Sequence, residues 1–146
     1  MRAGRLRSKA NRKIVLVVED EVCCREALRL ILESYGCRVL LASSCADALT
    51  LLTAYQENID LILLDIMMPD KTGIDFLIEV RAKNILGNIP VIIQSCESNE
   101  TIQEALNHGA CGYIHKPHVK AEIFRLVQNL VKPSQCTFSI GMMAFT

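Results

Sequence analysis

The chain has 146 residues, enough for one domain with a hydrophobic core and short for two. Hydrophobic residues make up 51% of it and charged residues 22%, which excludes a disordered chain, and the apolar runs are shorter than the roughly eighteen residues that span a bilayer. The net charge is zero, but residues 1–13 carry six basic residues and no acid, so residues 14–146 carry about −6 and direct nucleic-acid binding is not expected.

Residues 1–13 are therefore predicted to form a basic, disordered leader. The seven cysteines are an odd number without CxxC spacing, and no apolar export signal precedes them. Reduced thiols in a cytoplasmic protein fit this pattern better than a framework of disulfides.

The first structural element expected is a strand, Ile14–Val18, whose β-branched and wholly apolar run stops at Glu19 and Asp20. Apolar residues then recur at helical spacing as far as Tyr35. Gly36 follows at the place where a helix end favours glycine. The segment after the first strand is therefore predicted to be a helix.

The same alternation repeats along the chain. A second strand is expected at Arg38–Ala42, followed by a helix that starts at the N-cap Ser44 and runs to Tyr55. A third strand is expected at Asp60–Leu64 and ends directly before Asp65.

Thr72 has the spacing of a capping residue for a third helix, which runs towards Lys83. A fourth strand is expected at Ile89–Ser95, followed by a helix that closes at Gly109. Cys111–Lys116 is the fifth expected strand, and apolar residues at helical spacing over 119–130 predict a last helix.

Five strand–helix units with strands apolar on both faces predict an open α/β fold. In such a fold a parallel sheet is covered by helices on both faces and joined by right-handed crossovers. The domain is expected to span residues 14–131, and the tail 132–146 has no charge and no clear periodicity, so its structure is left unassigned.

In an open parallel sheet, ligands bind beyond the carboxyl ends of the strands. The polar residues expected there are Glu19, Asp20, Asp65, Ser95 and Lys116. Carboxylates brought so close together raise one another's pKa or need a cation, and Mg²⁺ suits a few carboxylates with water. A buried strand that ends on an aspartate is thus explained if the fold brings that aspartate to a reactive site.

Four motifs together resemble the receiver domain of bacterial-type two-component response regulators: VVEDE, DLILLDIMMPDKTGID, PVIIQS and GYIHKP. The resemblance extends from Ile14 to about Val131. It implies a flavodoxin-like, doubly wound, five-stranded parallel sheet of order 2-1-3-4-5 with helices on both faces. It also implies a signalling module that catalyses only its own phosphotransfer and dephosphorylation.

By this resemblance, Asp65 is the phospho-acceptor, and the donor is a histidine kinase or a histidine phosphotransfer protein. Glu19, Asp20, Asp65 and the backbone carbonyl of Met67 are expected to hold Mg²⁺. Lys116 is expected to supply a fixed positive charge. The cognate kinase and the output target are not encoded in these motifs.

The resemblance further implies that Ser95 turns towards the phosphoryl group and that Tyr113 swings inward, forming the switch. The Lys116–Pro117 bond is a candidate for the cis isomer. Glu19 stands where aspartate is common, and His118 stands where phenylalanine is common. Because residues 109–113 lack the acidic pair typical of one dimer class, a monomer or a weak dimer is expected.

Four alternatives bear on this assignment. A nucleotide- or flavin-binding enzyme needs a phosphate-cradling loop after the first strand, but here that loop is Glu19-Asp20-Glu21. An aspartyl phosphatase usually carries a second aspartate where Met67 stands. A receiver that only binds a partner typically lacks the acceptor, an acid or the lysine, and none of these is missing here. The chain also fits a stand-alone receiver, a relay intermediate or the receiver fragment of a larger regulator.

Overall fold

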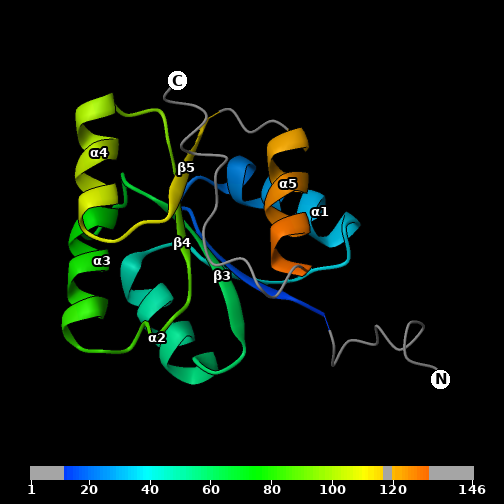
Figure 1. Ribbon diagram of the computed structural model, residues 1–146, viewed down its shortest axis with the longest axis horizontal. Coiled ribbons are helices and arrows are strands. Elements are labelled where there is room, and N and C mark those ends of the chain that lie inside the picture. The colour runs from blue at the N-terminus through cyan, green and yellow to red at the C-terminus, as the bar shows by residue number, and fades with distance from the viewer. Residues whose placement is uncertain (1–11, 117–119, 132–146) are drawn as a thin grey trace.

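The computed structural model describes residues 12–116 and 120–131. Within them, five strands form one parallel sheet in the order β2-β1-β3-β4-β5 (Figure 1). The strands are β1 (Ile14–Val18), β2 (Arg38–Ala42), β3 (Ile59–Asp65), β4 (Val91–Ser95) and β5 (Gly112–His115). The helices are α1 (Val22–Ser34), α2 (Cys45–Tyr55), α3 (Gly73–Ala82), α4 (Asn99–Asn107) and α5 (Lys120–Val131). The predicted fold class, strand order and element sequence are confirmed.

Some predicted boundaries were wrong by one or two residues. β3 begins one residue earlier than predicted and includes Asp65, which pairs with Gln94 of β4. β4 begins at Val91 and not at Ile89, because Pro90 has no N–H to donate to the sheet; its carbonyl instead accepts from Ile62. The predicted leader up to residue 11, the Lys116–Pro117 isomer, His118 and the tail 132–146 lie outside the described residues.

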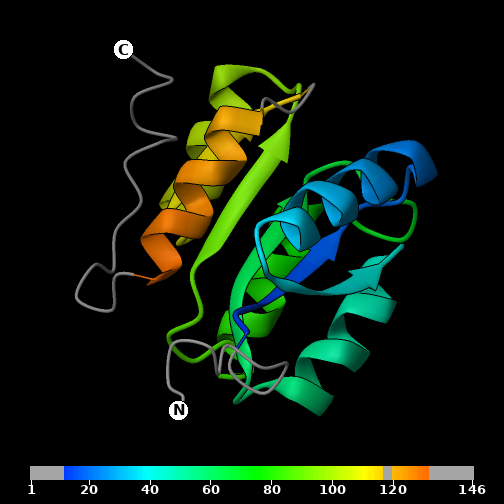
Figure 2. The same cartoon turned by 90° about the vertical axis from the view of Figure 1, so that its right-hand side faces the viewer.

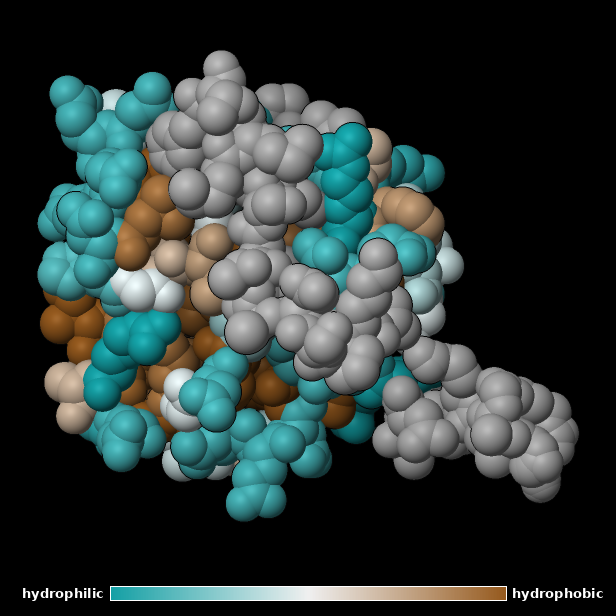
Figure 3. All heavy atoms as spheres, in the orientation of Figure 1, coloured by the Kyte–Doolittle hydropathy of each residue, from teal (hydrophilic) through white to brown (hydrophobic). Residues whose placement is uncertain are grey.

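The sheet separates two hydrophobic layers because successive residues of a strand point to opposite faces. Val15 and Val17 of β1 pack with α1 and α5, whereas Leu16 and Val18 pack with α2, α3 and α4. Helices α1 and α5 lie in front of the sheet in Figure 2. In the space-filling view, hydrophilic side chains surround much of the visible face, and apolar side chains lie between them (Figure 3). In the described part of the chain, none of the helices is both long and apolar enough to cross a membrane.

Side-chain caps set where the helices begin. Ser44 and Thr72, both predicted as caps, accept hydrogen bonds from the backbone N–H three residues further on, and Glu21 and Ser98 do the same for α1 and α4. Gly36 closes α1 with a φ of 90°. The four N-terminal caps fix the loops at the carboxyl edge of the sheet, where the parallel strands end.

A further cap comes from a loop distant in sequence. The Asp70 carboxylate, between β3 and α3, accepts from Cys45 N at 3.1 Å and from Ala46 N at 2.9 Å. The Cys45 thiol in turn donates to the carbonyl of Lys71 at 3.6 Å. The loop that follows Asp65 is therefore tied to the first turn of α2, which limits its movement.

We expect Asp70→Asn to lower the free energy of unfolding by about 1 kcal/mol, since the amide loses the charge-assisted contacts to α2. The hydrogen bonds from Cys45 and Ala46 hold the pKa of Asp70 below its ordinary value. A lowered folded pKa means that the stabilisation is present above the unfolded pKa and is lost as pH falls through the folded one.

Urea titrations at neutral and at acidic pH measure this effect, with Glu57→Gln at the opposite edge of the sheet as the control. The deficit of Asp70→Asn relative to wild type should shrink on acidification, while Glu57→Gln stays close to wild type. A deficit that is the same at both pH values would contradict the cap.

Candidate functional site

Three carboxylates converge at the carboxyl edge of the sheet. Glu19 and Asp20 follow β1, and Asp65 ends the neighbouring strand β3. Val18 pairs with Leu64, so the next residues of the two strands, Glu19 and Asp65, lie side by side. One carboxylate oxygen from each of the three acids lies within 4.8 Å of the others.

The three acids differ in burial. Glu19 is 0% exposed and Asp65 is 4% exposed, whereas Asp20 is exposed to solvent. Burial raises the pKa of Glu19, the Lys116 ammonium opposes that rise, and the nearby Asp65 carboxylate adds to it. The cluster thus combines two shielded carboxylates with one that faces water.

Lys116 contacts both buried carboxylates. Its Nζ lies 2.6 Å from Glu19 Oε1, in an ion pair without hydrogen-bond alignment, and it donates to Asp65 Oδ2 at 2.8 Å. Burial by itself lowers the pKa of Lys116, but the Asp65 and Glu19 carboxylates outweigh it, so the net shift is upward. The Lys116 side chain therefore remains a fixed positive charge at neutral pH.

The cluster fits a divalent cation. Three carboxylates and one ammonium leave two negative charges in excess when all are ionised, and their oxygens converge closely enough to bind one ion. Carboxylate oxygens together with water are the ligands that Mg²⁺ prefers. The predicted ligand set Glu19, Asp20 and Asp65 is thus brought together by the fold.

Arg25 of α1 is a neighbour of this site that the sequence analysis did not identify. Its Nη1 donates to the backbone carbonyls of Glu19 at 2.8 Å and Asp20 at 3.1 Å. A positively charged side chain near the N-terminus of a helix interacts unfavourably with the helix dipole. The position of Arg25 in the sequence was therefore a sign that this side chain has a specific partner. Arg25 fixes the backbone that carries two of the acids.

A buried amide lies next to Asp65 on the sheet. Gln94 of β4 is 0% exposed, pairs in register with Asp65, and its Nε2 lies 3.5 Å from the carbonyl oxygen of Val18, at the limit of a hydrogen bond. The sequence shows a glutamine within a mostly apolar strand, but it does not show which residues of the neighbouring strands the amide contacts.

The other predicted site residues surround the acids. The backbone N–H of Met67 lies 3.4 Å from Asp65 Oδ1, and its side chain is 57% exposed. Ser95 is buried, and its hydroxyl accepts from the N–H of Glu97 at 2.8 Å. The Ser95 hydroxyl is thus engaged by its own loop, while its backbone carbonyl accepts from Lys116 N at 3.1 Å.

Tyr113 occupies an inward position. It is 1% exposed, and its hydroxyl lies 3.3 Å from Nε2 of His115, two residues along β5. The two rings meet edge to face with centroids 5.0 Å apart. Burial raises the pKa of Tyr113, and the negative charge of Glu122 adds to the rise. The alternation of a strand places residues two apart on one face, which is the signal that links His115 to Tyr113.

Gly73 brings the start of α3 against the end of β3. Its N–H donates to the carbonyl of Ile66 at 2.7 Å, and a Cβ at this position would lie 2.2 Å from the backbone oxygen of Asp65. Only glycine permits this approach. The backbone from the Asp65 carbonyl to Ile66 is therefore held by the start of α3.

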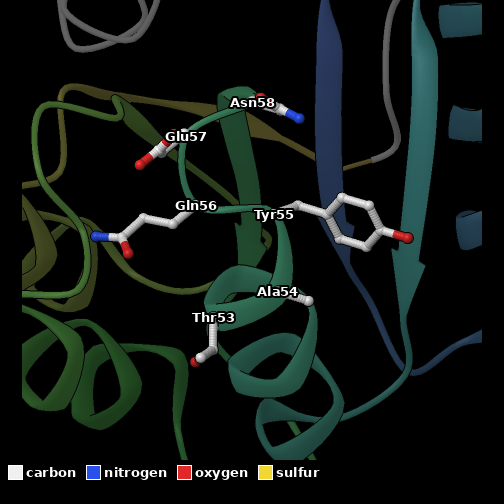
Figure 4. Close-up of a pocket in the computed structure, with 6 residues that line it drawn as sticks. All are labelled: Thr53, Ala54, Tyr55, Gln56, Glu57 and Asn58. Atoms are coloured by element: carbon white, nitrogen blue, oxygen red, sulfur yellow. The ribbon is translucent and has the colours of Figure 1, made fainter.

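The structure also contains a pocket of about 240 Å³ at the turn between α2 and β3 (Figure 4). It is lined by Thr53, Ala54, Tyr55, Gln56, Glu57 and Asn58. These residues are consecutive, and the turn lies at the edge of the sheet opposite the carboxylates. Among the described residues, its lining comes from this one segment and brings together no cluster of charged groups, so the acidic cluster is the stronger candidate.

The amino-acid sequence of this chain is similar to known protein families and to individual proteins. A family model described as the response regulator receiver domain matches residues 15–128. The two-component response regulator ARR14 of Arabidopsis thaliana is 32% identical over 119 residues, which cover 81% of this chain and 31% of that protein. The rice regulator ORR8 is 34% identical over 115 residues, covering 78% of this chain and 94% of the relative. The chain thus spans about a third of one relative and most of the other.

Solved structures agree with these matches. The receiver domain of the Francisella response regulator 1452 is 33% identical with a TM-score of 0.74, covering 84% of this chain and 99% of that one. The chain matched in the CheX-CheY-BeF3-Mg+2 complex from Borrelia burgdorferi is 28% identical with a TM-score of 0.74, covering 82% and 89%.

We expect Gly73→Ala to lower the free energy of unfolding by about 1–3 kcal/mol, because the new methyl group overlaps the Asp65 carbonyl and α3 must move away. Gly87→Ala is the control for the local displacement: its φ of 60° makes alanine unfavourable there too, but an added Cβ would meet nothing within 4 Å and lies away from Asp65 in sequence.

Urea unfolding measures both variants, and the amide NMR shifts of residues 65–67 report the local displacement. Gly73→Ala should shift these signals and Gly87→Ala should not. Unchanged signals in Gly73→Ala would contradict the close approach.

Proposed function

This chain belongs to the response regulator receiver domain family, and on that premise we propose that Asp65 accepts a phosphoryl group from a phosphohistidine. The observation that carries the proposal is the buried Asp65 carboxylate, which shares its cluster with Glu19 and Asp20 and contacts Lys116. The donor is a histidine kinase or a histidine phosphotransfer protein, and the domain spans residues 14–131.

In the transfer step, a carboxylate oxygen of Asp65 forms a bond to phosphorus as the bond from phosphorus to the histidine nitrogen breaks. The electron pair of that bond returns to the imidazole of the donor. The product is an acyl phosphate on Asp65. The protein acts as a signalling module here, since the phosphoryl group ends on its own side chain.

Phosphoryl transfer is catalysed mainly by positioning the reactants and by stabilising the negative charge on the transferring oxygens. Glu19, Asp20, Asp65 and the backbone carbonyl of Met67 would hold Mg²⁺, which supplies positive charge for the transferring oxygens. Lys116 holds a second positive charge against Asp65 from the other side. The Borrelia complex contains BeF3 and Mg²⁺, and this supports the binding of Mg²⁺ by the present chain.

Ser95 and Tyr113 form the switch in this proposal. The Ser95 hydroxyl leaves the N–H of Glu97 and turns to the phosphoryl group, while the inward position of Tyr113 becomes more populated. Charge at Asp65 thus biases a two-state element on the face of α4, β5 and α5. The output target reads that face.

The two relatives differ in how much of their length this chain matches. The chain spans 31% of ARR14 and 94% of ORR8, so it suits either a receiver within a larger regulator or a receiver that acts by itself. We propose a monomer or a weak dimer, because residues 109–113 lack an acidic pair.

With Mg²⁺ and a small phosphodonor such as acetyl phosphate, wild-type protein should gain the mass of one phosphoryl group. Asp65→Asn should gain none, because an amide cannot form the acyl phosphate. Asp75→Asn, which changes an exposed acid in the first turn of α3, is the matched control and should be labelled like wild type. Intact-mass spectrometry measures all three, and stoichiometric label on Asp65→Asn would refute the assignment.

The lifetime of the acyl phosphate should depend on Met67. Its exposed, apolar side chain lies two residues past Asp65 and has no group that orients water. We therefore expect Met67→Asn to hydrolyse its acyl phosphate several-fold faster than wild type, because the amide can position a water for attack.

Decay of the phosphorylated mass at a fixed Mg²⁺ concentration measures this rate. Ile78→Asn on α3 is the control for adding an amide at an exposed apolar position, and it should decay like wild type. Glu97→Gln separates any contribution from the acid two residues past Ser95. An unchanged or slower decay in Met67→Asn would remove the shielding role.

A further inference from the structure

Tyr113 carries a polar group into the protein interior. Its side chain is 1% exposed and belongs to the hydrophobic cluster that includes Ile93 of β4 and Ala105 of α4. A buried phenol hydroxyl needs a hydrogen-bond partner, because it has lost its contacts with water. The inward position of Tyr113 therefore depends on the groups that the protein offers to this hydroxyl, and not only on the packing of the ring.

His115 provides one such partner. Its Nε2 lies 3.3 Å from the Tyr113 hydroxyl, and the two rings meet edge to face with centroids 5.0 Å apart. In the tautomer that carries its proton on Nδ1, Nε2 accepts a hydrogen bond from the hydroxyl. The imidazole therefore contacts Tyr113 in two ways, through a hydrogen bond at the hydroxyl and through the ring.

The position of His115 on the sheet explains both contacts. It is the last residue of β5 and lies two residues after Tyr113, so both side chains leave the strand on the face that packs with α4. Tyr113 is buried on that face, whereas His115 is exposed at the end of the strand. The imidazole thus links the buried hydroxyl to the surface of the protein.

His115 also lies beside Ser95, the other residue of the proposed switch. Ser95 of β4 pairs in register with His115, and paired residues of neighbouring strands share a face of the sheet. The carbonyl of Ser95 accepts from the N–H of Lys116, the residue after His115, which holds the two strands together at this point. The backbone of His115 is therefore fixed next to Ser95, while its side chain contacts Tyr113.

We propose that His115 is a positioning residue for Tyr113: its Nε2 holds the tyrosine hydroxyl and thereby keeps the ring inward before any phosphoryl group is present. This inference deepens the proposed function and rests on it for the role of Tyr113 in a switch. The contact itself involves neither Asp65 nor a metal ion.

A switch held in this way populates its inward state more strongly at rest. Part of the free energy that favours the inward tyrosine comes from His115 and is present in the unphosphorylated protein. Phosphorylation of Asp65 then shifts the equilibrium less, because a population that is already largely inward has little left to gain. The identity of residue 115 therefore sets the ratio between the resting and the phosphorylated output of this chain.

Three-bond NMR couplings to Cγ of Tyr113 measure its χ1 populations in the unphosphorylated 146-residue protein without Mg²⁺. Wild type should show one dominant rotamer. His115→Phe keeps an aromatic ring for the edge contact but has no atom that accepts a hydrogen bond, so the ratio of inward to outward rotamers should fall about fivefold. His115→Gln offers an amide oxygen as the acceptor and should restore most of that ratio.

His108→Phe is the matched control, because it places the same ring at another exposed histidine, at the end of α4. It should leave the Tyr113 couplings at their wild-type values. Wild-type couplings in His115→Phe would overturn the inference. A His115→Gln variant that behaves like His115→Phe would overturn it too, since the hydrogen bond would then not be what holds the ring.

The same couplings after treatment with acetyl phosphate and Mg²⁺ test the consequence for the switch. They should change less in wild type than in His115→Phe, which starts with fewer inward rotamers. An equal change in both proteins would overturn the bias at rest. The first measurement uses unphosphorylated protein, and intact-mass spectrometry records the label on each variant, so a failure of this inference is distinct from a failure of Asp65 to accept phosphate.

Discussion

The burial of Glu19 and Asp65 side by side is the constraint on which the rest of the site depends. Two shielded carboxylates repel each other and lose hydration, so the arrangement is unfavourable unless positive charge is close. Lys116 supplies that charge from the far end of the sheet, 2.6 and 2.8 Å from the two acids. One lysine does not neutralise the cluster, and the remaining negative charge makes this edge a place for a cation.

The surrounding structure keeps the acids in place in spite of their repulsion. Arg25 fixes the backbone after β1, and Asp70 ties the loop after β3 to α2. Gly73 lets α3 begin against the backbone of Asp65 itself. These contacts come from three different helices, so the geometry of the acids is a property of the whole sheet and its connections. Electrostatic catalysis requires charges that are already in position before the reaction begins, and a site held by these contacts meets that requirement.

Most of the fold was predictable because each level of the sequence agrees with the next. Apolar runs such as Ile14–Val18 end at polar residues, and caps such as Ser44 and Thr72 precede helical spacing, so element type and order followed. The convergence of Glu19, Asp20, Asp65 and Lys116 followed in turn from the rule that the ends of parallel strands share an edge.

Contacts between side chains distant in sequence were not predictable in the same way. Nothing in the local pattern specifies that Asp70 caps α2 or that the Gln94 amide lies against the carbonyl of Val18, since both contacts depend on tertiary packing.

Borohydride reduction of the phosphorylated wild-type protein, followed by peptide mass mapping, tests the central claim directly because it converts an aspartyl phosphate to homoserine. The account predicts homoserine at position 65 alone and only when Mg²⁺ is present. Reduction at another acid, or none after phosphorylation, would contradict it.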